Sequence, residues 1–114
     1  MTLSVCLIIR NEEENIQRCL DSVSDIATEI IVVDTGSTDR SKELLGFYST
    51  VRIFDFTWQN DFSAARNYCL EQAKCEWILV LDADEELMDG TALEQCMTSN
   101  TVDAYSLLIR NILA

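Results

Sequence analysis

Short apolar runs recur along the chain, and each of them ends at polar residues. They lie at residues 3–9 (LSVCLII), 29–33 (EIIVV) and 77–81 (WILVL), and residues 51–54 (VRIF) form a shorter segment of the same kind. A continuous apolar run of this length, bounded by charged residues, is typical of a parallel strand covered on both faces. The pattern therefore predicts four strands of a parallel sheet.

The segments between these strands have the apolar spacing of a helix. In the first of them, four apolar residues recur at positions i, i+3, i+4 and i+7, which places them on one face of a helix. These residues are Ile16, Cys19, Leu20 and Val23. We expect this helix to begin near Glu12, with Asn11 as its N-terminal cap.

Three further helices and one further strand complete the predicted order. The helices extend from Ser41 to Phe47 or Tyr48, over residues 62–74 and over residues 91–98, and the strand lies near residues 104–109. Strands that alternate with helices form βαβ units with right-handed crossovers. The expected fold class is therefore α/β, with a doubly wound, mostly parallel sheet and helices on both faces. The direction of the last strand is left open, because nothing local decides it.

Two carboxylates follow directly on the run at residues 77–81. Asp82 and Asp84 lie two positions apart, so in extended backbone their side chains leave the same face. Because neighbouring carboxylates repel each other at low dielectric, the pair favours a cation, and Mg²⁺ or Mn²⁺ prefers oxygen ligands of this kind. The alternative is a solvated acidic turn, with Glu85 and Glu86 on the approach to a helix.

Polar residues also follow the first two strands, at the edge of the sheet where such folds bind ligands. Asn11 and Glu12 come after the first strand and Asp34 after the second. Neither a dinucleotide-binding glycine fingerprint nor a P-loop is present in the sequence, so no glycine loop cradles phosphate here. A bound phosphate would instead need the cation at Asp82 and Asp84.

Two arginines are candidates to assist that cation. Arg10 ends the first strand, and Arg66 lies near the start of the helix at residues 62–74. The alternative for Arg66 is a surface ion pair with Glu12, Asp61 or Glu71. Asp39 is interpreted as a helix cap, and Trp58 and Trp77 as apolar packing residues before any role in sugar stacking.

Length and charge restrict the class of protein. A chain of 114 residues with 48% hydrophobic residues predicts one globular domain over residues 1–114. Its net charge of −12 argues against a nucleic-acid partner, because such partners are bound by clustered Lys and Arg. No apolar run approaches the ~20 residues of a membrane-spanning helix, and no signal layout is present. We expect a cytoplasmic location, with peripheral attachment to the inner face of a membrane left open.

The cysteines indicate packing and not catalysis or metal binding. There are five of them, with no His in the chain: Cys6, Cys19, Cys69, Cys75 and Cys96. The chain has no C-x-x-C pair and no histidine to complete a zinc site, and the Ser-His-Asp and Cys-His arrangements are excluded. We expect most of the thiols to be reduced core residues.

Four ordered sequence blocks resemble glycosyltransferase family 2, which has the GT-A fold. They are residues 4–16 (SVCLIIRNEEENI), 30–41 (IIVVDTGSTDRS), 62–67 (FSAARN) and 77–87 (WILVLDADEEL). The resemblance covers essentially the whole chain. The variant W-x-x-D-F-S-A-A-R-N, together with D-A-D-E, also resembles a bacterial subgroup that includes glucosyltransferases of surface polysaccharide and peptide substrates.

The resemblance implies a role for each candidate residue. Asp34 would hydrogen-bond the nucleobase, usually uracil, and residues 9–12, including Arg10, Asn11 and Glu12, would line the nucleotide pocket. Arg66 would lie beside the nucleotide. Asp82 would contact the ribose or the metal, and Asp84 would ligate a Mg²⁺ or Mn²⁺ ion that bridges the diphosphate of a UDP-sugar.

The resemblance also implies that part of the enzyme lies outside this chain. In the family the general base of the inverting transfer lies in a C-terminal half, so we expect it beyond residue 114 and interpret the chain as the nucleotide-sugar-binding domain of a longer glycosyltransferase. The acceptor, whether surface polysaccharide, lipid-linked glycan or peptide, is not indicated. Apolar surface beside the last strand would favour self-association, for example as a homodimer.

Two other classes of protein stay open at this point. The chain could be a nucleotide-binding or interaction module without transferase activity. It could also be a phospho-receiver domain, which has a similar length but requires an acidic pair after strand one and a phosphoacceptor Asp after strand three. Here Arg10, Asn11 and Glu12 follow strand one and the third strand ends near Asp55, so the receiver is disfavoured.

Overall fold

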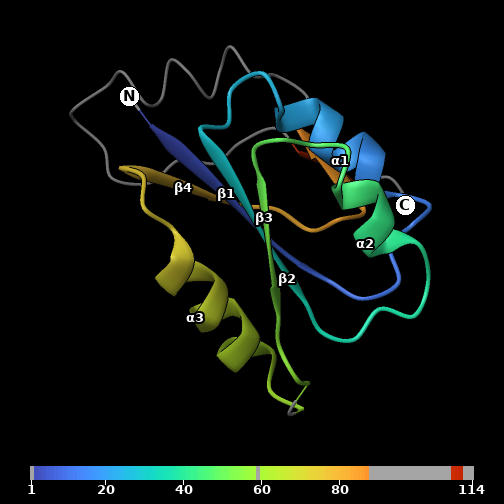
Figure 1. Cartoon of the computed structure of the whole chain (residues 1–114). Helices are drawn as coiled ribbons and strands as arrows, with labels where there is room; N and C mark the ends of the chain where they lie inside the picture. Colours follow the sequence, from blue (N-terminus) through green and yellow to red (C-terminus); the bar gives the residue numbers. More distant parts are fainter. Residues whose placement is uncertain (1, 59, 88–108, 112–114) are drawn as a thin grey trace.

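The chain folds around a parallel sheet in this computed structural model, which describes residues 2–58, 60–87 and 109–111 (Figure 1). The elements in chain order are β1 (Leu3–Ile9), α1 (Ile16–Val23), β2 (Glu29–Asp34), α2 (Ser41–Leu45), β3 (Val51–Asp55), α3 (Phe62–Gln72), β4 (Trp77–Val80), β5 (Glu85–Leu87) and β6 (Ile109–Asn111). The helix expected at residues 91–98, most of the strand expected at residues 104–109, and Cys96 lie outside the described residues. Among the described helices, none combines the length and the apolar character needed to cross a bilayer.

The main sheet has the strand order β3-β2-β1-β4, and all three neighbouring pairs are parallel. In register, Ile9 pairs with Asp34, and Asp34 pairs with Asp55, so these strands end at one edge. The order reverses between β1 and β4, the type of position where ligands of doubly wound folds bind. A receiver-type sheet would have the order 2-1-3-4-5, so this topology excludes the phospho-receiver alternative.

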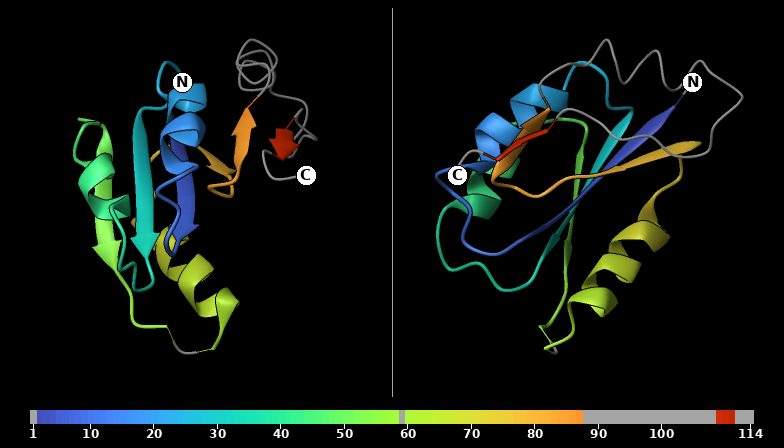
Figure 2. Two further views of the ribbon diagram at one scale, coloured as in Figure 1. Left: turned by 90° about the vertical axis from the view of Figure 1, so that its right-hand side faces the viewer. Right: turned by 180° about the vertical axis from the view of Figure 1, so that it is seen from behind.

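Helices cover both faces of the sheet, as the sequence predicts. Odd-numbered residues of β1, such as Val5 and Leu7, pack with Ile16 and Leu20 of α1 in one core. The other face carries a smaller core in which Cys6 packs with Ile31, Val33 and Cys69, the last of which belongs to α3. Figure 2 shows α3 on the opposite side of the sheet from α1 and α2. The α/β expectation is confirmed.

The expectation that the run at residues 77–81 is buried on both faces is wrong for β4. Leu79 and Leu81 are buried, but the alternate residues Ile78 and Val80 are 44% and 38% exposed. Among the described strands β4 lies at an edge of the main sheet and pairs only with β1. Position in the sheet, which a continuous apolar run does not specify, decides how much of each face is covered.

Residues 85–87 also differ from expectation. Glu85 and Glu86 belong to β5, which pairs antiparallel with β6 in a separate two-stranded sheet, and not to a solvated turn. β5 lies against α1, where the Leu87 backbone N–H donates to Ser22 Oγ over 3.0 Å. The described end of the last strand is therefore antiparallel and lies outside the main sheet.

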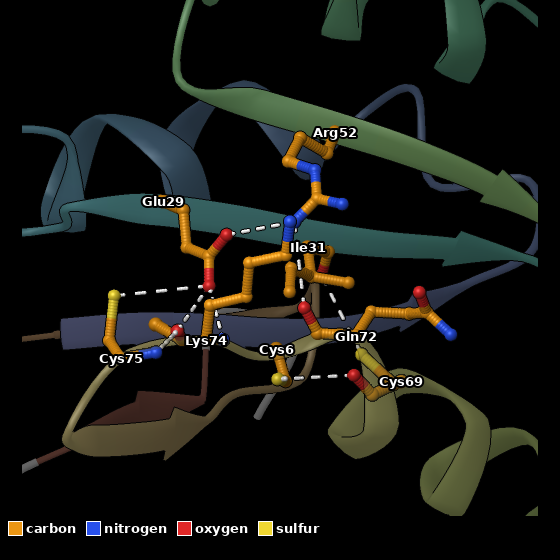
Figure 3. A network of polar contacts seen from close by, with 9 residues as sticks. Cys6, Glu29, Ile31, Arg52, Cys69, Gln72, Lys74 and Cys75 are labelled. Carbon is orange, nitrogen blue, oxygen red and sulfur yellow. Dashed lines mark hydrogen bonds and ion pairs between the residues drawn. The ribbon is translucent and has the colours of Figure 1, made fainter.

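A network of polar contacts around Glu29 holds the C-terminal end of α3 at the end of the sheet where the strands begin (Figure 3). Glu29 Oε1 pairs with Arg52 of β3 at 3.0 Å, and Oε2 accepts from Ser4 Oγ at 2.6 Å and from the Lys74 backbone N–H at 2.7 Å. Burial raises the pKa of Glu29, but the hydrogen bonds from Ser4, Lys74 and Arg52 outweigh it and lower the pKa below its usual value. This network orients α3 from the amino-terminal ends of the strands, whereas the candidate site lies at their carboxyl ends.

Candidate functional site

The loop after β1 is joined to the loop after β2 by Asn11. Its side-chain Oδ1 accepts from the backbone N–H of Thr38 at 2.7 Å and of Asp39 at 3.3 Å, while its own N–H donates to Ser37 Oγ at 2.9 Å. The residue has a φ of 55°, a left-handed conformation that Asn tolerates better than most residues. Asn11 therefore positions the loop at residues 35–40.

The prediction that Asn11 caps α1 is wrong. The helix begins at Ile16, and the residue at its cap position is Asn15, without a side-chain capping bond. Local sequence at Asn11 resembles a cap, but the tertiary contacts with the second loop use its side chain instead. Asp39, expected to cap the next helix, accepts from the Ser41 N–H at 2.9 Å at the start of α2 and from the Glu13 N–H at 3.2 Å.

Asp34 has the most specific environment of the candidate residues. It is only 2% exposed, and its Oδ1 accepts from the backbone N–H groups of Gly36 at 2.8 Å and Ser37 at 2.7 Å. Gly36 has a φ of 118°, which residues with a side chain rarely adopt. Within the described part of the chain, Oδ2 is buried without a hydrogen-bond partner. A buried carboxylate oxygen in this state is a ready acceptor for a ligand N–H group.

A hollow of about 340 Å³ opens beside Asp34 at the carboxyl ends of β2 and β3. Its lining combines residues of the turn after β2, an ion pair and aromatic rings. The lining residues are Asp34, Thr35, Gly36, Ser37, Lys42, Asp55, Phe56, Thr57 and Trp58. Trp58 is 37% exposed at this position, so its ring offers a surface for stacking as well as packing. The hollow is of a size and character to hold a flat ring that carries an N–H donor.

Negative charge gathers where β1 and β4 end. Burial raises the pKa of Glu12 against a hydrogen bond from Asn15, and the charges of Asp84, Asp39 and Asp82 raise it further. Asp82 is exposed and Asp84 half-buried, and the Asp82 N–H donates to Glu85 Oε1 over 2.9 Å. The fold therefore brings Glu12, which follows β1, near Asp82 and Asp84, which follow β4.

The donor set suits a hard divalent cation that is shared with a ligand. No group of three or more His, Cys, Asp or Glu side chains in residues 2–58 and 60–87 is arranged to hold a metal by itself. Mg²⁺ is commonly held by only one or two carboxylates, with water and substrate phosphates completing its shell. Asp82 and Asp84 fit an ion bound in that way and not within a closed protein cage.

The two candidate arginines differ in position. Arg10 is exposed directly after β1. Arg66 is half-buried on α3, where its guanidinium lies 5.0 Å from the Phe62 ring, and it lines a small cavity together with Asp82. In the described part of the chain Arg66 forms no ion pair, and its Nε is buried without a hydrogen-bond partner. The surface-pair alternative is therefore not observed, and Arg66 lies on the Asp82 side, away from the hollow beside Asp34.

Sequence reasoning missed two charged residues of the hollow. Lys42 forms an ion pair with Asp55, and both line the hollow with Asp34. Asp55 carries the same signal as Asp34, because it ends the neighbouring strand in register with it. Lys42 has no such signal, since its proximity to Asp55 depends on how α2 packs beside β3.

The described cysteines are structural. Cys6, Cys19, Cys69 and Cys75 are free thiols, and the first three are buried. Burial, reinforced by the charges of Glu85, Asp82 and Asp84, raises the pKa of Cys19 to about 12. Cys69 is hydrogen-bonded to Cys6 and buried, and both effects raise its pKa well above the usual range. The expectation of reduced core thiols is confirmed for Cys6, Cys19 and Cys69, whereas Cys75 is only half-buried.

Comparison with known proteins agrees with this fold. A family model described as "Glycosyl transferase family 2" matches residues 4–108. Glycosyltransferase SunS of Bacillus subtilis is 43% identical over 84 residues, which cover 73% of this chain and 20% of the relative.

Two solved structures share the fold. Residues 1–349 of Staphylococcus aureus TarS in complex with UDP align with a TM-score of 0.75 and 26% identity, over 85% of this chain and 31% of that one. Glucosyl-3-phosphoglycerate synthase of Mycobacterium tuberculosis, solved with Mn²⁺, UDP and glucosyl-3-phosphoglycerate, aligns with a TM-score of 0.61 and 27% identity, over 74% of this chain and 34% of that one. The same synthase has been solved with Mg²⁺ and UDP. The chain thus spans about a fifth to a third of the length of these proteins.

Proposed function

The chain belongs to glycosyl transferase family 2, and from this premise we propose that it is the donor-binding part of an inverting glycosyltransferase that uses a UDP-sugar and a divalent metal. The fold is that of the GT-A glycosyltransferases. What the residues of this chain contribute is binding and orientation of the nucleotide, together with the carboxylates that hold the cation.

The free Oδ2 of Asp34 is the observation that carries the proposal. Two backbone N–H groups fix Oδ1, so the orientation of the carboxylate is set before any ligand arrives. The unused oxygen is buried at the hollow, where it can accept one hydrogen bond from a ring N–H such as that of uracil. Leaving it unpaired costs about 1–3 kcal/mol, which a ligand donor would recover on binding.

The diphosphate would extend from this hollow toward the ends of β1 and β4. Strand β1 lies between β2 and β4, so the polar residues after Ile9 lie between Asp34 and the D-x-D pair. Arg10 and Arg66 supply the positive charge on this path, and Asn11 keeps the two loops that border it together. In this proposal, the nucleotide-binding residues named from the sequence all border one continuous site.

Asp82 and Asp84 would hold Mg²⁺ or Mn²⁺, which supplies a positive charge to neutralise the departing nucleoside diphosphate. Support comes from the carboxylate donor set and from the solved synthase with Mn²⁺ or Mg²⁺ and UDP. Glu12 adds negative charge nearby without being assigned as a ligand.

A second class of function is a nucleotide-binding module without transferase activity of its own. It is favoured by one observation: the chain covers 20% of SunS and 31% of the TarS fragment, so most of each of these proteins has no counterpart in this chain. Turnover of a UDP-sugar by this chain would distinguish a complete enzyme from a binding module. Acceptor and general base belong to the whole protein.

Isothermal calorimetry with UDP, in the presence and absence of Mn²⁺, tests the donor site. We expect binding that is at least tenfold weaker when the metal is removed by a chelator. Asp84→Ala should lose the metal-dependent part of the affinity while the far-ultraviolet circular dichroism stays unchanged. Asp25→Ala, which removes an exposed carboxylate after α1, is the matched control. Equal UDP affinity in Asp84→Ala and in the unsubstituted chain would contradict the assignment.

A further inference from the structure

A second charged group faces the hollow beside Asp34. Lys42, the second residue of α2, forms an ion pair with Asp55 at the end of β3. Asp34 and Asp55 are partners in the parallel register of β2 and β3, so their Cα atoms are roughly 5 Å apart. The hollow is lined by all three residues. An ammonium group thus lies at the same pocket as the free oxygen of Asp34.

The ion pair with Asp55 keeps this ammonium charged and in place. Its hydrogen bond to Asp55 raises the pKa of Lys42 above the usual value, and the charges of Asp55 and Asp34 act in the same direction. A lysine ammonium can only donate hydrogen bonds, whereas an ionised carboxylate can only accept them. Among the groups that line the pocket, Asp34 Oδ2 is a buried acceptor without a partner in the described residues, and Lys42 Nζ is a donor.

We propose that Lys42 is a base-specificity residue of the nucleotide pocket, an inference that rests on the proposed function. Asp34 accepts from the ring N–H of the base, and Lys42 donates to the exocyclic carbonyl oxygen O4 beside it. An N–H flanked by two carbonyls is the imide edge of uracil and thymine. Cytosine presents a ring nitrogen that accepts and an amino group that donates, so it mismatches both protein groups. Rejection by such unpaired polar groups is an effective source of specificity.

The competing explanation is that Lys42 attracts the diphosphate and does not read the base. Lys42 is half-exposed, and a surface ammonium would favour any phosphorylated ligand. The two explanations differ for uridine, which has the base but no phosphate. A contact with the base weakens uridine and UDP by the same factor on removal of the ammonium, whereas a contact with phosphate weakens UDP alone.

The test compares Lys42→Met with the unsubstituted chain for binding of UDP, CDP and uridine. Met keeps most of the length and apolar stem of Lys but cannot donate. We expect about tenfold weaker binding of both UDP and uridine, with CDP affinity not lowered, so the UDP-to-CDP ratio falls by about tenfold. Lys74→Met removes an equal charge at the opposite edge of the sheet and should leave all three affinities unchanged.

Two results would overturn the inference while leaving the proposed function standing. One is a loss of UDP affinity in Lys42→Met without loss of uridine affinity, and the other is an unchanged UDP-to-CDP ratio. Failure of the proposed function looks different, because the unsubstituted chain would then bind neither UDP nor uridine. Circular dichroism of each variant separates a loss of contact from a loss of fold.

Discussion

At the level of single residues, Asp34 and Asn11 hold the loops that border the candidate site. Asp34 uses one oxygen to hold its own loop and leaves the other free. Asn11 uses its amide oxygen to hold the neighbouring loop and adopts a left-handed backbone to do so. Neither role could be assigned from residue type alone, since both residues also fit turns and caps.

Asp34→Asn reverses the hydrogen-bonding character of one atom. The amide oxygen can still accept from Gly36 and Ser37, so the NH₂ group would replace Oδ2 and present donors where the carboxylate presented an acceptor. We expect UDP to bind roughly ten- to a hundredfold more weakly and the preference to shift toward CDP, measured by calorimetry with both nucleotides. Retention of the original UDP affinity would show that Oδ2 does not contact the base.

Asn11→Gly and Asn11→Ala separate two contributions of the same residue. Both remove the bonds to Thr38 and Asp39, but only Ala must strain to keep a φ of 55°. Urea unfolding should show Gly destabilised by about 1–2 kcal/mol and Ala by roughly a further 1 kcal/mol. If Ala were no less stable than Gly, the left-handed backbone at this position would not be retained in solution.

At the level of helices and strands, polar contacts hold the loops and helix ends at both ends of the parallel strands. The loops after β1 and β2 are joined at the carboxyl edge by Asn11, and the end of α3 is held at the other edge by Glu29. β4 lies at an edge of the described sheet with one face half-exposed. The strength of each fastening can be measured apart from ligand binding.

Glu29→Gln should weaken the attachment of α3 in a pH-dependent way. The folded-state pKa of Glu29 lies below its usual value of 4.5, so its charge stabilises the fold above that pH, and the stabilisation is lost as the pH falls through the folded-state pKa. We expect Gln to cost about 1–3 kcal/mol at pH 7 and the difference in unfolding free energy to shrink below roughly pH 4.5. A difference that stays constant from pH 7 to pH 3 would contradict this account.

The two faces of β4 should respond differently to substitution. Leu79→Ala opens a cavity in the core and should cost about 2–4 kcal/mol, because Leu79 is only 6% exposed. Ile78→Thr keeps the β-branched shape on the half-exposed face and should cost less than about 1 kcal/mol. Thermal or urea unfolding of both variants measures the contrast, and equal losses would mean that the outer face is covered in solution.

At the level of the whole molecule, binding and stability are linked. A ligand that binds only the folded chain stabilises it by about 2.7 kcal/mol at a concentration of 100 times its Kd. UDP with Mn²⁺ should therefore raise the Tm by several degrees, and excess chelator should remove most of that rise. CDP is the matched control and should give a smaller shift. An identical rise with and without metal would argue against cation binding at Asp82 and Asp84.

Other expectations about the whole molecule stay predictions. They are the single domain over residues 1–114, the homodimer, the acceptor class and the cellular location. Sedimentation of the chain over a range of concentrations would test the homodimer. The family, by contrast, is established by the match over residues 4–108.

The sequence by itself determined the fold class and which carboxylates follow the ends of the strands. Apolar runs that end at Asp34 and Asp82 specify strands and place carboxylates at their ends, because strand periodicity and burial are local properties of the chain. The family resemblance followed from the same ordered blocks. β1, β2, β3 and α3 accordingly lie close to where the pattern predicts them.

Only the tertiary structure decided which of these groups meet. Two features differ from the sequence interpretation: the half-exposed face of β4 and the strand at Glu85. Two more add to it: the link that Asn11 makes between two loops and the ion pair of Lys42 with Asp55. Each of them depends on residues distant in sequence. A pattern of neighbours along the chain carries no information on such contacts, whereas packing of the helices against the sheet determines them.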